Sequence, residues 1–192
     1  MVSALDAKDP HIRGHSERVA LYARRLAKEV GLDELSCEII YLAGLLHDVG
    51  KIGVPDVVLL KSGTLTEHES RVMQQHPDQG WSILQDVTQI KYVLPGVLHH
   101  HERFDGTGYP DSLAGSAIPL SARILSVVDA YDAMSHSRRY RQSLSHDESL
   151  QALREGAGTQ WDPEIVEAFL AIVPDVISIR DSYNPPASCQ RR

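Results

Sequence analysis

Three histidines stand in a row within the stretch LHHHERFDGTGYPD, residues 98–111. Histidine is awkward to bury unless a partner satisfies its ring, so such a run is either exposed or part of a metal site. In a helix, His100 and His101 would share the face of Val97, which lies three and four residues before them. His99 would point away from that face. The spacing therefore predicts an inward-facing pair, His100 and His101, with His99 as a bystander.

Other histidines and aspartates also fall at positions that a helical fold should keep apolar. His15 lies on the apolar face of one predicted helix, His47 and Asp48 end a second, and Asp129 lies inside a third. A charge buried without a partner costs several kcal/mol, so several such residues together are better explained by one shared cation or cluster. We therefore expect these side chains to converge on a common site.

The residue types indicate what this site would bind. Imidazole and carboxylate donors together suit Fe, Mn, Zn, Co or Ni and not calcium, and no thiolate is offered. An adjacent pair such as His47-Asp48 suits two ions, because the imidazole binds one and the carboxylate can bridge to the next. Two ions a few ångströms apart activate a water and clamp an attacked phosphate. Lys51, one turn past His47, would add a positive charge or a proton donor.

The elements that must position these residues are predicted to be helices. Apolar residues recur at helical spacing, and no alternating strand pattern of useful length is present. Pro95 lies within one helical segment, which is either kinked or begins near the proline. Thr66 with Glu69 resembles a capping box, and the Gly- and Pro-rich residues 104–119 indicate a loop. The helical segments are predicted at residues 17–31, 34–50, 89–102, 120–135, 145–158 and 162–173.

Composition bounds the domain organisation and the partners. The chain has 192 residues, and we expect one domain over residues 1–175 with a flexible tail at 176–192. The formal net charge of −7 argues against a DNA- or RNA-polymer binder and against a basic membrane-surface domain. Cys37 and Cys189 form no CxxC motif and no disulfide framework, which suits a reducing cytoplasm. The N-terminus lacks the apolar region of a signal peptide, and no apolar run is long enough to span a bilayer.

Several motifs carry a family resemblance. The segment His47-Asp48-x-x-Lys51 resembles the signature of HD-domain metal-dependent phosphohydrolases. HHERFDGTGYP, residues 100–110, is similar to the extended motif of the HD-GYP subfamily, bacterial phosphodiesterases of cyclic di-GMP. The blocks DPHIRGHSERVA, HPDQG, VVDAYDAM and RRYR match the family's blocks in order, so the resemblance covers about residues 9–173. It implies an all-α fold, an HD-domain helical bundle with a metal centre in its core and a Gly/Pro-rich GYP loop.

The resemblance also implies roles for individual residues. The positions that match the family's metal ligands are His15, His47, Asp48, His76, His100, His101 and Asp129. The positions that match its substrate-binding loop and basic residues are Gly108, Tyr109, Pro110, Arg138 and Arg141. Asp48 matches the bridging position, and Lys51 matches the catalytic lysine that assists at the phosphate. His76 enters only through the resemblance, because a helix start explains a histidine at that position equally well.

The implied cofactors are two divalent ions, iron or manganese. Some family members hold a third metal through a glutamate one turn before the first ligand. Here that position is His11, which lies four residues before His15, so both can face one site. We expect two ions, with His11 as the position for a third. Glu102 is a candidate for holding a ligand histidine in one tautomer, and Asp132, one turn from Asp129, is either a partner behind a ligand or a helix-cap contact.

The implied function is hydrolysis of cyclic di-GMP to pGpG, and to GMP after a second cut. Three alternatives remain open on the sequence. They are a phosphodiesterase of another cyclic dinucleotide such as 3′,3′-cyclic GMP-AMP, a catalytically weak sensor or interaction module, and a helical domain without a site. By analogy with signalling output domains, we also expect a homodimer and, in a longer parent protein, an upstream sensor or receiver domain.

Overall fold

The computed structural model describes residues 14–136 and 143–183, and within them the structure is helical. The helices in chain order are α2 (His15–Glu29), α3 (Glu34–Leu46), η1 (Val49–Gly53), α4 (Asp56–Leu59), α5 (Glu67–Met73), α6 (His76–Leu84), η2 (Thr88–Val93), α7 (Leu94–His99), η3 (Gly115–Ala117), α8 (Leu120–Ser135), α9 (His146–Gly156), α10 (Pro163–Ala171) and α11 (Val173–Ser182). In these two ranges the only β-type pairing is an isolated bridge between Ala157 and Trp161. The predicted all-α class is confirmed.

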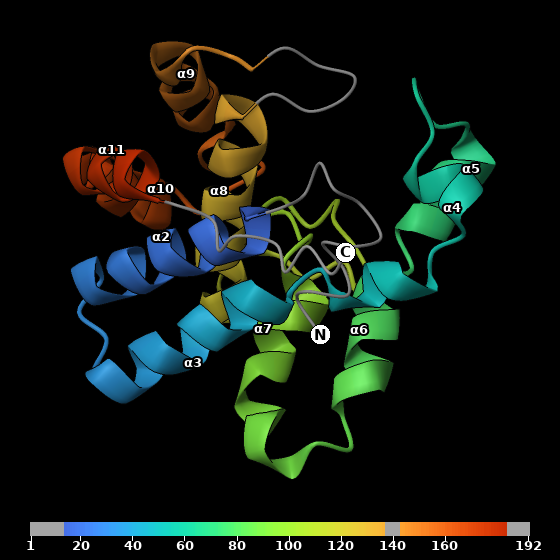
Figure 1. Ribbon diagram of the computed structural model, residues 1–192. Coiled ribbons are helices and arrows are strands. Elements are labelled where there is room, and N and C mark those ends of the chain that lie inside the picture. The colour runs from blue at the N-terminus through green and yellow to red at the C-terminus, as the bar shows by residue number, and fades with distance from the viewer. Residues whose placement is uncertain (1–13, 137–142, 184–192) are drawn as a thin grey trace, which may run out of the picture.

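Helix α8 is the central element of the bundle. It packs against α2, α3 and α7 and also contacts α9 and α10, while α4 and α5 lie at the periphery (Figure 1). Tyr22 and Leu26 from α2 meet Leu125 and Tyr131 from α8, and all four side chains are fully buried. Each such side chain contributes about 1.5–3 kcal/mol on burial. The apolar helix face predicted for residues 17–31 is therefore buried in the hydrophobic core.

The helix predicted over residues 34–50 ends earlier than expected. Asp33 caps its start by accepting a hydrogen bond from the Ser36 backbone N–H at 2.7 Å, and the helix ends at Leu46. The chain then turns at Asp48, whose φ and ψ are −95° and 4°, and continues into the short helix η1. His47 and Asp48 thus lie in a buried turn between two helices, and the prediction of one continuous helix is wrong.

Gly50 lets η1 approach α6 more closely than any other residue would. A Cβ atom at Gly50 would lie 1.9 Å from the backbone oxygen of His76 and 2.5 Å from the backbone nitrogen of Gly80. Both neighbours are backbone atoms that cannot rotate away. The contact brings the first turn of α6, with His76, against the turn that carries His47 and Asp48.

Other expected features are found as predicted. Thr66 and Glu69 form a capping box at the start of α5. The segment predicted over residues 89–102 divides between η2 and α7, and α7 begins at Leu94, near Pro95 as expected. The bounds of α8 coincide with the predicted residues 120–135.

The end of the described chain differs from the prediction. Helix α11 continues to Ser182, and Val176 is fully buried in the core. The expected boundary at residue 175 therefore falls inside a packed helix. His11, Arg138, Arg141 and residues 184–192 lie outside the described ranges. None of the described helices has the length and apolar composition that a membrane span requires.

Candidate metal centre

The seven expected metal ligands lie together in one cluster. Three of its histidines are oriented by the same kind of hydrogen bond. The Nδ1 atoms of His47, His76 and His100 each lie 2.7–2.8 Å from the backbone oxygen three residues earlier. A carbonyl oxygen only accepts, so Nδ1 carries the proton in each ring. The other ring nitrogen, Nε2, is then free to offer its lone pair, which is the arrangement found in metal-ligating histidines.

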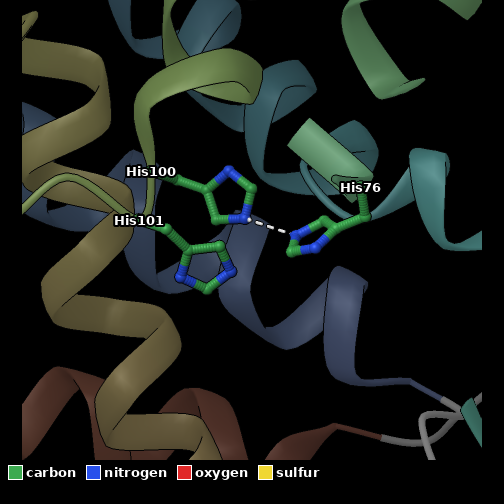
Figure 2. Close-up of side chains that lie close together, drawn as sticks. All are labelled: His76, His100 and His101. Atoms are coloured by element: carbon green, nitrogen blue, oxygen red, sulfur yellow. Dashed lines mark hydrogen bonds between the residues drawn. The ribbon is translucent and has the colours of Figure 1, made fainter. Parts of the chain in front are cut away.

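The free nitrogens of His76 and His100 face each other. Their Nε2 atoms lie 3.3 Å apart, and His101 lies beside them (Figure 2). Because both rings already donate through Nδ1, two neutral rings in this position present two acceptors and no proton between them. One ring nitrogen from each of His76, His100 and His101 falls within 4.8 Å of the others, which is close enough for one ion.

Burial keeps these imidazoles neutral. It lowers the pKa of His76 to about 3, with the nearby Lys51 charge acting in the same direction. Burial also lowers the pKa of His101 to about 4 and that of His100 well below its usual value. The neutral ring is the form that binds a metal.

A second set of ligand atoms lies on the other side of Asp48. Nε2 of His15 is 3.2 Å from Oδ1 of Asp129, and Nε2 of His47 is 4.0 Å from the same oxygen. Donor atoms of these three residues also fall within 4.8 Å of one another. Six of the seven expected ligand positions are therefore brought together in two groups of three.

Asp48 stands between the two groups. Its Oδ1 lies 3.4 Å from Nε2 of His76, and its Oδ2 lies 3.4 Å from Nε2 of His47 and 3.9 Å from Nε2 of His15. Burial alone would raise the pKa of Asp48, but nearby positive charge, that of Lys51 foremost, holds it well below the usual value. Nζ of Lys51 lies 2.6 Å from Oδ2. An ionised carboxylate with one oxygen facing each group is the arrangement that a bridging ligand needs.

Unpartnered buried atoms show that a metal fits this site. Nε2 of His47 and Oδ1 of Asp48 are buried and make no hydrogen bond within the described part of the chain. Buried polar atoms are rarely left in this state, because each costs about 1–3 kcal/mol. Cations between the two groups would satisfy both atoms, and nitrogen and carboxylate donors without a thiolate suit divalent ions such as those of Fe, Mn, Zn, Co or Ni.

His15 is supported differently from the other ligand histidines. Its Nδ1 lies 2.7 Å from Oδ2 of buried Asp132. The Asp132 carboxylate also accepts two hydrogen bonds from the Arg18 guanidinium, at 2.7 and 2.9 Å. Burial lowers the pKa of His15, but the hydrogen bonds with Asp129 and Asp132 outweigh it and raise the value to about 9. A cation at Nε2 would displace the proton held there against Asp129. Asp132 thus lies behind a ligand, one of the two places expected for it.

Changing Asp132 to asparagine should weaken metal binding on the His15 side by roughly 10- to 100-fold, the usual effect of losing a partner behind a ligand. Asparagine keeps the size but removes the charge that supports His15 and pairs with Arg18. Competition with a chromophoric chelator would measure this, with exposed Asp147→Asn as the matched control. Equal affinity in both variants would contradict the role of Asp132.

Glu102 does not take the role expected for it. Its carboxylate accepts hydrogen bonds from the backbone N–H groups of Asp111 at 2.7 Å and Leu113 at 3.1 Å. Nδ1 of His99 lies 3.7 Å from the same carboxylate, and within the described ranges Glu102 holds none of the ligand histidines. Glu102 instead shapes the GYP loop, and His99 lies outside the cluster as predicted.

The loop places Tyr109 against the cluster. The Tyr109 ring stacks on His101, with ring centroids 4.9 Å apart and planes 27° apart. Burial raises the pKa of Tyr109, so its phenol stays protonated and uncharged. Gly108 and Pro110 flank it, with Gly108 passing so close to Arg103 that a Cβ atom would lie 2.3 Å from the Arg103 backbone nitrogen.

Sequence reasoning missed Arg18. It lies three residues after His15 on the same helical face, and this spacing was a usable signal. Nothing local in the sequence marked Ser126 or Gln160, whose places beside the cluster depend on packing between distant segments.

The comparisons with known proteins agree with this geometry. The family model of the HD domain matches residues 1–165. The cyclic di-GMP phosphodiesterase response regulator RpfG of Xanthomonas campestris pv. campestris is 42% identical over 173 residues, covering 88% of this chain and 46% of that protein. The 3′3′-cGAMP-specific phosphodiesterase 3 of Vibrio cholerae is 38% identical over 174 residues, covering 89% of this chain and 38% of that protein.

A solved structure shares the fold. An HDG"Y"P protein from Bdellovibrio bacteriovorus superposes with a TM-score of 0.70 at 20% sequence identity, covering 85% of this chain and 52% of that one. The chain spans less than half the length of the two curated relatives. On its match to the family model and its similarity to these relatives, this chain belongs to the HD domain family and to its HD-GYP group.

Proposed function

We propose that this chain is the catalytic domain of a metal-dependent phosphodiesterase that hydrolyses cyclic di-GMP to pGpG, and to GMP after a second cut. The observation that carries the proposal is the position of Asp48, with one oxygen toward each group of histidines. The names of the relatives support the reaction class, and the first-named relative is a cyclic di-GMP phosphodiesterase.

The metals would be two iron or manganese ions. His15, His47, Asp48 and Asp129 would hold one, and Asp48, His76, His100 and His101 the other. When bound, two such ions supply an activated water at neutral pH and neutralise charge on the phosphate. A third ion at His11 stays a prediction.

Lys51 is the catalytic cation that the chain itself provides. Its ammonium lies 2.6 Å from Asp48, and its side chain is 15% exposed, so it lies at the edge of the cluster. A phosphate brought to the cluster would meet this charge, which would stabilise the extra negative charge that develops as the phosphodiester bond breaks. Tyr109 would close the other side of the site from the loop. Arg138 and Arg141 remain the basic residues proposed to meet the phosphates.

The setting of the domain is also a proposal. The name of RpfG describes a response regulator, and this chain spans 46% of its length, which supports an additional regulatory domain in a longer parent protein. We further propose a cytoplasmic location and a homodimer, as for other signalling output domains. The alternative substrate is 3′,3′-cyclic GMP-AMP, since a relative named for it is nearly as similar as RpfG.

The test begins with the chain purified without oxygen and its metals counted by elemental analysis. Cyclic di-GMP and 3′,3′-cyclic GMP-AMP are then added separately, and products are followed by chromatography. Two iron or manganese ions per chain and release of pGpG or GMP would support the proposal. Bound metal without turnover of cyclic di-GMP, even after reloading with Fe(II) or Mn(II), would reject it in favour of the second substrate or of a sensor.

A further inference from the structure

A pocket of about 190 Å³ adjoins the metal centre on the side of α8. His100, His101 and Asp129 form the wall that it shares with the cluster, and Ser126 and Gln160 line the rest together with the segment after His101. Ser126 and Asp129 are three residues apart on α8 and share one face. A group bound in this pocket would therefore touch the atoms that hold the metals.

Two polar side chains in the pocket have no hydrogen-bond partner among the described residues. The Gln160 amide and the Ser126 hydroxyl make no hydrogen bond to any residue in the two described ranges, although both residues are partly buried. The backbone of Gln160 is fixed, because its N–H bonds the oxygen of Gly156 at 2.9 Å and its oxygen accepts from Phe104 N–H at 3.2 Å. A glutamine whose backbone is fixed and whose side-chain amide is free is suited to form hydrogen bonds with a ligand.

The space beside the pocket contains a third unsatisfied group. A void of about 10 Å³ shares Glu102, Ser126 and Gln160 with the pocket and is also lined by Trp161. The buried indole N–H of Trp161 has no acceptor in the described residues. The void has the size of a single water, which could connect this donor to a ligand in the pocket.

The charges of the pocket argue against an anion. Arg103 is paired with Asp105 at 2.9 Å and bonds Thr107 at 2.8 Å, so its charge is already matched. Glu102 and Asp129 add negative charge to the lining. Away from the wall that it shares with the metal ligands, the described lining offers no unpaired cation, so this part of the pocket favours a neutral, hydrogen-bonding group over a phosphate.

A nucleobase meets these requirements. Sites for whole drug-sized ligands occupy about 300–1,000 Å³, so this pocket has room for one part of a dinucleotide and not for all of it. An amide side chain can donate to and accept from the edge of a purine at the same time. The base would sit beside the metals while its own phosphodiester lies on them.

We propose that this pocket binds one purine base of the cyclic dinucleotide and that Gln160, assisted by Ser126, determines the specificity for that base. The assignment rests on the proposed phosphodiesterase function and names a substrate contact within it. Gln160 acts on binding of the base and takes no part in breaking the phosphodiester.

The test compares a substrate with bases and a substrate without them. Cyclic di-GMP and bis(p-nitrophenyl) phosphate are both phosphodiesters, and the second offers no purine to the pocket. Gln160→Ala should raise KM for cyclic di-GMP roughly tenfold, the loss of about one good hydrogen-bonding contact, and leave kcat/KM for bis(p-nitrophenyl) phosphate unchanged. Gln160→Glu, which keeps the shape and loses the N–H donors, should behave similarly, and Ser126→Ala should show a smaller rise.

The control is Gln151→Ala, a matched change at an exposed glutamine of α9 whose side chain donates a hydrogen bond to Glu155. Calorimetric binding of pGpG supplies a readout that is independent of turnover, and thermal unfolding checks that each variant is folded. An unchanged KM and pGpG affinity in Gln160→Ala, or an equal loss with both substrates, would overturn the pocket assignment alone. A wild-type chain that cleaves bis(p-nitrophenyl) phosphate but neither binds nor cleaves a cyclic dinucleotide would overturn the proposed function as well.

Discussion

Replacing Asp48 with asparagine should reduce hydrolysis of cyclic di-GMP by at least roughly 100-fold and lower the number of bound metals per chain. Even partners behind the ligands change metal affinity or activity by about 10- to 100-fold, and Asp48 contacts both ligand groups directly. Asparagine keeps one oxygen and presents an amide nitrogen, which has no free lone pair for an ion, to the other group. It also leaves Lys51 without its carboxylate at 2.6 Å.

Elemental analysis and product chromatography on the same preparation would measure both effects. The control is Asp78→Asn, the same chemical change at an exposed position in the first turn of α6. Circular dichroism should show both variants to be helical. Full activity with two metals in folded Asp48→Asn would refute the bridging assignment.

Replacing Gly50 with alanine should have the largest effect on folding. The new Cβ atom would lie 1.9 Å from the His76 backbone oxygen, a distance that no rotamer change can relieve. Overpacking of this kind costs about 1–3 kcal/mol and occasionally more, and here the atoms that must move belong to α6. Because His76 would be displaced with them, ion binding by His76, His100 and His101 should weaken as well.

Urea unfolding of the metal-free chain would measure the loss of stability, and metal titration the loss of affinity. Gly96→Ala serves as the control, since its Cβ atom would meet side-chain atoms of Ala43, Leu125 and Ser121 at 3.2–3.3 Å. Those atoms can shift by a few tenths of an ångström, so the cost should stay below that of Gly50→Ala. Equal stability of the two variants would contradict the prediction, because it would show that η1 and α6 can move apart at little cost in free energy.

The sequence was sufficient for helices such as α2 and α8 and for the two histidines of the segment predicted over residues 89–102. Helical spacing from Val97 placed His100 and His101 inward and His99 outside, and the structure has this arrangement. Asp129 was identified because a carboxylate is out of place in the apolar helix α8. Local periodicity carries this information, since it decides which side of a helix is buried.

The remaining features depend on contacts between distant segments. No local pattern showed that α3 ends at Leu46, because the segment is apolar on nearly every face. His76 could not be assigned from spacing, since it reaches the cluster only through the close approach of α6 to Gly50. The hydrogen bonds of Glu102 with loop N–H groups could not be predicted from the sequence either, because they depend on how residues 111–113 fold back toward Glu102.

The unpartnered atoms of His47 and Asp48 also have a consequence for the amount of protein in a cell. Ions that bind only the folded chain add RT ln(1 + [L]/Kd) to its free energy of unfolding, which is about 4.1 kcal/mol at 1,000 times Kd. Proteases remove unfolded chains, so a change of about 1–2 kcal/mol can alter abundance several-fold. The lifetime of this protein should therefore rise and fall with the supply of its metal. Under the proposed function, the capacity of the cell to hydrolyse the cyclic dinucleotide should change with it.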